Sequence, residues 1–184
     1  MDAFDFFNSF FGLVLGLSVT VMATGLATAI QHRRTIEIGY LTPLLALFIG
    51  LDIANFWASA WGTFRNLPFS YGLLTGGLSI SLIYFIAASL VFPHLIKDGI
   101  SLDDHFWMNK KVVLLLSFTA NLLIQISTIF VALSRGVNFE FSLGILSLLN
   151  IPAAFTRRQI VFCCAIGLYI AIYITFAFVS VLAS

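Results

Sequence analysis

The chain has 184 residues, of which 60% are hydrophobic and 9% are charged, and its formal net charge is +1. Soluble globular domains carry about a quarter charged residues, so this composition excludes a soluble domain and favours a membrane protein.

The apolar residues fall into six stretches that predict membrane-spanning helices. In chain order these are Phe6 to Ile30, Tyr40 to Gly62, Tyr71 to Phe92, Lys111 to Leu133, Phe141 to Thr156 and Gln159 to Leu182. A helix of about 20 apolar residues covers the ~30 Å hydrocarbon core of a bilayer. Because the apolar runs are continuous, they exclude an outer-membrane barrel, whose segments alternate over about 10 residues. We predict an all-α polytopic membrane protein with six transmembrane helices in a single domain, residues 1–184.

The fifth stretch is shorter than the others, and its form stays open. A less tilted helix, a helix lengthened by Val137 and Phe139, and a locally thinned bilayer are all compatible with its length. A re-entrant segment is a further alternative, because Asn150 and Pro152 near its inner end favour a bend.

The distribution of positive charge predicts the topology. Seven of the nine Lys and Arg residues lie in three of the connections, as Arg33-Arg34, as Lys97 with Lys110-Lys111, and as Arg157-Arg158. Short loops rich in Lys and Arg stay in the cytoplasm. The sequence therefore predicts three cytoplasmic loops, both termini outside, and an arrangement of three helical hairpins.

Small residues predict where helices cross closely. Gly12 and Gly16 share one face of the first stretch, and Gly72 and Gly76 share one face of the third. Small residues at this spacing let helix backbones approach within the membrane. We expect close crossings at these glycines, within one subunit or between two.

Asp52 is the only acid deep inside a predicted span, with Phe48, Ile49, Leu51 and Ile53 around it. A charge at this depth costs several kcal/mol, so the carboxyl must be protonated, paired or hydrated. Asn55 lies three positions later, on the same helix face. Asn121 and Gln125 belong to a polar stripe along the fourth stretch, at a similar depth. We predict that Asp52, Asn55, Asn121 and Gln125 form one buried polar site.

Two interpretations of this site remain open. Asp52 is an ion or proton site, since intramembrane acids often mark transport paths. Alternatively, a protonated Asp52 only hydrogen-bonds Asn121 or Gln125 and fixes two helices together, at a gain of about 0.5–2 kcal/mol.

The cytoplasmic segment 94–105 holds weak candidates for a metal site, namely His94, Asp103, Asp104 and His105. Two histidines and two acids within a dozen positions match the ligand types of divalent metals. The competing interpretation is a helix start, in which Ser101 and Asp104 form a capping box and the acids face the positive end of the helix. All three histidines lie on the cytoplasmic side, which disfavours a haem held within the bundle. No catalytic motif is present, and no cofactor is predicted.

Several segments resemble a family of small bacterial six-helix integral membrane proteins to which no activity is assigned. The resemblance rests on 16–20 and 25–27 leading to Arg33-Arg34, on 56–61, on Tyr84-Phe85 with 90–93, and on 104–106 before Lys110-Lys111. It implies a multi-pass protein of the bacterial cytoplasmic membrane and gives no mechanism.

Three functions follow as hypotheses. The first is a channel-like or transporter-like protein, most simply a homo-oligomer, that passes or senses a small ion through Asp52. The second is an accessory subunit of a larger membrane complex. The third, and the only enzymatic one, is a membrane enzyme acting through the 94–105 segment. The lipid bilayer is the expected surrounding in each case, and no nucleic-acid partner is expected.

Overall fold

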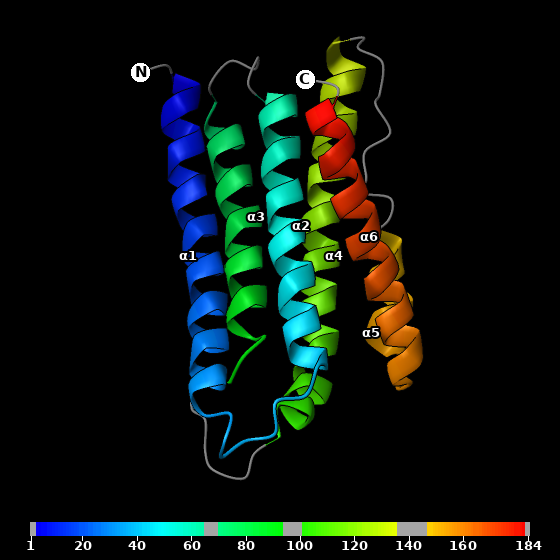
Figure 1. Cartoon of the computed structure of the whole chain (residues 1–184). Helices are drawn as coiled ribbons and strands as arrows, with labels where there is room; N and C mark the ends of the chain where they lie inside the picture. The colour runs from blue at the N-terminus through cyan, green and yellow to red at the C-terminus, as the bar shows by residue number, and fades with distance from the viewer. Residues whose placement is uncertain (1–2, 65–69, 94–100, 136–146, 183–184) are drawn as a thin grey trace.

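The computed structural model describes residues 3–64, 70–93, 101–135 and 147–182, and within these residues all regular structure is helical. The helices are α1 (Ala3–Gln31), α2 (Leu41–Phe64), α3 (Tyr71–Ser89), α4 (Leu102–Arg135), α5 (Asn150–Phe155) and α6 (Gln159–Leu182), and they stand nearly parallel in one bundle (Figure 1).

Five of the described helices are long and apolar enough to cross a membrane, namely α1, α2, α3, α4 and α6. This confirms the predicted all-α membrane protein. The predicted fifth span differs, because its described part is the short helix α5 of 6 residues, preceded by a 3₁₀ turn at 147–149. Residues 141–146 of that predicted span lie outside the described residues.

Helix α4 begins at Leu102 rather than at Lys111, where the apolar run starts, so the predicted boundary was wrong. The Ser101 hydroxyl accepts a hydrogen bond from the Asp103 N–H at 3.2 Å and caps the helix. Asp103 and Asp104 in the first turn complement the positive end of the helix dipole. The polar residues before Lys111 therefore extend the helix instead of forming a loop.

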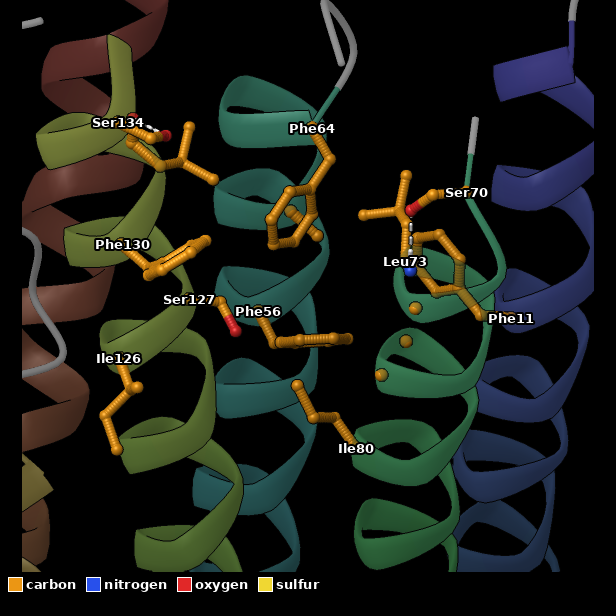
Figure 2. Close-up of a pocket in the computed structure, with 15 residues that line it drawn as sticks. Phe11, Phe56, Phe64, Ser70, Leu73, Ile80, Ile126, Ser127, Phe130 and Ser134 are labelled. Atoms are coloured by element: carbon orange, nitrogen blue, oxygen red, sulfur yellow. Dashed lines mark hydrogen bonds between the residues drawn. The ribbon is translucent and has the colours of Figure 1, made fainter. Parts of the chain in front are cut away.

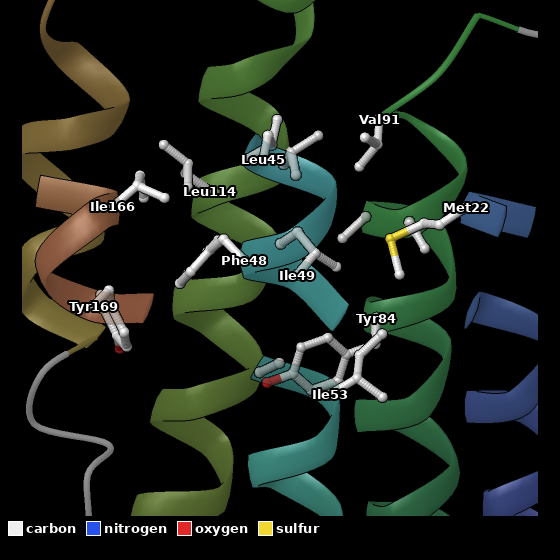
Figure 3. Packing of buried hydrophobic residues seen from close by; sticks show 14 of the residues in the cluster. Met22, Leu45, Phe48, Ile49, Ile53, Tyr84, Val91, Leu114, Ile166 and Tyr169 are labelled. Carbon is white, nitrogen blue, oxygen red and sulfur yellow. The ribbon is translucent and has the colours of Figure 1, made fainter. Parts of the chain in front are cut away.

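Helix α2 lies inside the bundle and contacts α1, α3, α4 and α6. Its buried positions are Leu41, Thr42, Leu45, Phe48, Ile49, Asp52, Ile53, Phe56, Ala60 and Phe64. They recur at spacings of three and four, which places them on one broad face. Figure 3 shows part of the core that this face forms with side chains of α1, α3, α4 and α6. Asp52 thus points into the most enclosed part of the protein.

Helix α1 packs mainly against α3 and less against its sequence neighbour α2. Helix α1 also lies close to the segment that follows α3, because a Cβ added at Gly25 would lie 2.6 Å from the Cβ and Cγ of Phe92. Within one subunit the described residues form no close crossing at Gly16, Gly72 or Gly76, because a Cβ at each would meet nothing within 4 Å, and crossings between two subunits stay a prediction. Gly12 does face a neighbour, with Trp57 at 3.4 Å from its added Cβ.

Candidate functional site

The Asp52 carboxyl lies at the centre of a buried hydrogen-bond cluster. The Tyr173 hydroxyl donates to Oδ1 at 2.7 Å, and the Ser117 hydroxyl donates to Oδ2 at 2.5 Å. The Tyr84 hydroxyl donates to Oδ2 at 3.1 Å. The Asn121 side-chain amide reaches both oxygens, at 3.0 and 2.9 Å. We call Asp52, Tyr84, Ser117, Asn121 and Tyr173 the Asp52 cluster.

Four helices position the cluster. Ser117 and Asn121 are one turn apart on α4, so both face α2, and the Asn121 amide also donates to the Ser117 carbonyl at 3.0 Å. Tyr84 comes from α3 and Tyr173 from α6, each from the middle of an apolar helix. The carboxyl therefore links α2 to three other helices at one depth.

The short helix α5 joins the cluster through its first residue. The Asn150 side-chain amide donates to the Ser117 hydroxyl oxygen at 3.2 Å. The buried Asn150 Oδ1 has no hydrogen-bond partner among the described residues. Ser117 thus accepts from α5 while it donates to Asp52.

Aromatic rings close the cluster on two sides. The Phe56 ring packs on the Tyr84 ring with centroids 5.4 Å apart. On the other side Tyr169 packs on Phe48 and on Tyr173, both at 5.0 Å. Asp52 has an exposed fraction of 0%. Water therefore does not reach the carboxyl in this conformation.

All the described partners of Asp52 are neutral. A buried charge is costly unless it is paired or well hydrogen-bonded, and neutral donors offset part of that cost. An ionised carboxylate accepts about four hydrogen bonds, the number that its two oxygens offer. The four donor side chains supply that number, so the cluster meets the hydrogen-bonding demand of the carboxyl without a cation.

The structure brings together two of the four residues predicted for this site, Asp52 and Asn121. Asn55 and Gln125 are half-buried and are not hydrogen-bonded to the carboxyl within the described part of the chain. The two tyrosines were not predicted. The sequence feature that could have identified them is a tyrosine within an apolar helix, because a buried tyrosine hydroxyl needs a hydrogen-bond partner.

A cavity of about 560 Å³ lies between α1, α2, α3 and α4, in the half of the bundle that holds the start of α1. Phe56 and Ile80 line the part of the cavity nearer to Tyr84, and Phe64 and Ser70 line the part nearer to the end of the bundle (Figure 2). Phe56 and Tyr84, with their rings in contact, separate this cavity from Asp52. The cavity therefore ends about one helical turn short of the carboxyl.

The 94–105 segment does not assemble a metal centre from its described residues. His94 lies outside the described residues. The His105 ring contacts the Leu90 carbonyl at 3.1 Å and the Asn109 amide at 3.2 Å. The described part of the chain has no group of three or more His, Cys, Asp or Glu side chains placed to hold a metal. The Ser101 cap described above supports the helix-start interpretation.

Lys110 is buried in the bundle, although the charge pattern predicted it in a cytoplasmic loop. Its exposed fraction is 4%. The ammonium donates to the carbonyls of Ala153 and Thr156 at the end of α5, and it lies 4.2 Å from the centroid of the Trp107 ring. Lys110 therefore fixes the end of α5 while Asn150 fixes its start.

Fold and site together define a helical integral membrane protein with a carboxyl cluster at the centre of its bundle. No protein-family model, curated protein or solved structure matches the chain.

Proposed function

We propose that this is a multi-pass protein of a bacterial cytoplasmic membrane in which Asp52 takes up and releases a proton, as part of proton-coupled transport or sensing. The basic loops and the family resemblance support this membrane, with six crossings and both termini outside. The start of α1 and the end of α6 lie at the same end of the bundle (Figure 1). Helices α4 and α6 run in the same direction (Figure 1), which supports a sixth crossing between them.

One observation carries the proposal, namely the three hydroxyls on Asp52. Those of Ser117, Tyr84 and Tyr173 each contact a carboxyl oxygen. A hydroxyl both donates and accepts, and its hydrogen rotates to suit its partner. With the carboxylate ionised, all three donate to it. With the carboxyl protonated, one hydroxyl rotates so that its oxygen accepts a hydrogen bond from the carboxyl O–H. Both protonation states fit the same heavy-atom positions.

The chemistry of the cluster favours a proton over a metal cation. Cations such as Na⁺ or Ca²⁺ require several oxygen ligands with free lone pairs. Here the Asn121 amide and the three hydroxyls direct hydrogens at the carboxylate oxygens. The Asn121 amide nitrogen has no lone pair to offer a metal ion, and it already lies against both carboxyl oxygens, so an ion at this carboxyl would have to displace it. The exchangeable species is therefore the proton.

The conformation described here is a closed one. On the cavity side, the packed rings of Phe56 and Tyr84 lie between the cavity and Asp52. The Tyr84 hydroxyl lies on the Asp52 side of this barrier.

Proton flux into liposomes loaded with a pH-sensitive dye tests the proposed function. Under an imposed pH gradient and potential, the native protein is expected to carry a proton flux. Asp52→Asn is expected to abolish it, because the side-chain amide of asparagine does not take up or release a proton at the pH values of the experiment. Asn55→Ala is the matched control, since it removes a polar side chain of α2 that does not contact the carboxyl. Equal flux in the native protein and Asp52→Asn would contradict the proposal.

A structural role for the cluster is the second candidate, and full burial of Asp52 favours it. In that role the carboxyl only holds α2, α3, α4 and α6 together, and the protein serves as an accessory subunit or a homo-oligomer in a larger assembly. If the native protein, Asp52→Asn and Asn55→Ala all carry no proton flux in liposomes, the result favours the structural role over the proton function. Co-purification of a specific membrane protein would then support the accessory role.

A further inference from the structure

The cavity between α1 and α4 has a lining that is almost wholly apolar. Its walls include Phe11 of α1, Phe56 of α2, Ile80 of α3 and Phe130 of α4. The volume of about 560 Å³ lies within the range of small-molecule sites, about 300–1,000 Å³. Among the described residues of its walls, three serines carry the hydroxyl groups, and their hydrogen bonds determine what the cavity can hold.

These hydroxyls are already engaged within their own helices. Ser127 donates to the Leu123 carbonyl at 2.9 Å, and Ser134 donates to the Val131 carbonyl at 3.0 Å. Ser70 accepts from the Leu73 N–H at 3.2 Å as the cap of α3. A polar ligand would lose its hydration and gain little in return. The lining therefore suits a hydrocarbon.

The opening of the cavity lies between α3 and α4. The exposed residues of its lining are on these helices, including Gly72, Gly76, Ile126 at 54% and Phe130 at 72% exposed. Figure 2 shows Ile126 and Phe130 of α4 on one side and Ile80 and Leu73 of α3 on the other. Glycines in the wall of α3 leave the gap unfilled, because a Cβ at Gly72 or Gly76 meets nothing within 4 Å.

We propose that the acyl chain of a bilayer phospholipid enters this cavity from the side, between α3 and α4, and packs against Phe11 and Phe56. The opening lies in membrane-spanning helices, so hydrocarbon chains border it directly. An apolar volume of this size left empty would forfeit the dispersion contacts of its walls, and a neighbouring chain restores them. The chain ends against Phe56, whose ring also packs on Tyr84. The inference stands on the cavity alone and does not rest on the proton function.

Photo-crosslinking with a phosphatidylcholine that carries a diazirine in its acyl chain tests this inference in nanodiscs free of detergent. Lipid around the protein labels Ile126 and Phe130 in any case, because both are exposed. Phe11 and Phe56 have exposed fractions of 1% and 2%, so only a chain inside the cavity labels them. Mass spectrometry of the digested protein is expected to find label on Phe11 and Phe56.

Gly76→Leu and Gly72→Leu fill the cavity from the wall of α3 and are expected to abolish the label on Phe11 and Phe56, while that on Ile126 remains. Gly167→Leu is the control, since Gly167 of α6 also has open space around it and lies outside the cavity. Label confined to exposed residues in the native protein would overturn the proposal. So would label on Phe11 and Phe56 that both cavity-filling variants leave unchanged.

Discussion

Replacing Asp52 with leucine is expected to lower the free energy of unfolding by about 2–4 kcal/mol. The substitution leaves the hydroxyls of Ser117, Tyr84 and Tyr173 and the amide of Asn121 without their common acceptor. Hydrogen bonds between membrane helices average ~0.6 kcal/mol and reach ~1.7 kcal/mol, and a buried donor left unpaired costs about 1–3 kcal/mol. Unfolding of the purified protein by a denaturing detergent measures the change. Asp52→Asn keeps one acceptor oxygen and is expected to cost less than half as much.

Two tyrosines on α6 provide a matched pair for the same experiment. Tyr173→Phe removes a hydroxyl that donates to Asp52 and is expected to cost about 0.5–1.5 kcal/mol. Tyr169→Phe removes a buried hydroxyl with no hydrogen-bond partner among the described residues, so no loss of stability is expected and a gain of up to about 1–3 kcal/mol follows from removing the unpaired donor. Equal effects of the two substitutions, or a leucine variant as stable as the native protein, would show that the cluster contributes little to the fold.

Replacing Gly25 with alanine is expected to destabilise the contact of α1 with α3 by about 1–3 kcal/mol, the usual cost of overpacking. The new Cβ would lie 2.6 Å from the Cβ and Cγ of Phe92. The Phe92 Cβ is attached to the backbone, so a rotamer change does not remove the clash, and the segment that follows α3 must move away from α1. The same unfolding assay measures the effect.

Gly16→Ala is the control for Gly25, because it changes the same helix at a position with nothing within 4 Å of the added Cβ. Alanine favours a helix over glycine by about 0.5–1 kcal/mol, so this variant is expected to be as stable as the native protein or slightly more stable. A Gly25 variant that behaves like the Gly16 variant would mean that the two helices do not meet closely at Phe92.

The sequence predicted two of the five residues of the Asp52 cluster because acids and amides are rare within apolar spans. Asp52 and Asn121 stand out against their neighbours, and their depths match, so their contact was predictable. Tyr84 and Tyr173 were missed because tyrosine is common in apolar helices, and only the helix packing determines which hydroxyl meets the carboxyl. Asn55 has the right spacing from Asp52, but it lies toward the edge of the buried face and does not reach the cluster.

The fold was predictable to a similar extent. Hydropathy located the long helices, since crossing a bilayer requires long apolar runs. It misplaced the start of α4, because the hydropathy drops at Lys110 and Lys111 while the helix continues back to the cap at Ser101. The packing of α1 against α3 was not predictable from spacing, since Gly25 makes the close contact and Gly16, with the motif spacing, does not.

The central claim is that Asp52 exchanges a proton, and infrared difference spectroscopy of the protein in lipid tests it most directly. Spectra taken at low and high pH contain the carbonyl band of every carboxyl that gains a proton. The account predicts one such band that the native protein and Asn55→Ala share and that Asp52→Asn lacks. Identical difference spectra in all three proteins at every pH at which they remain folded would contradict the account and leave Asp52 with a structural role alone.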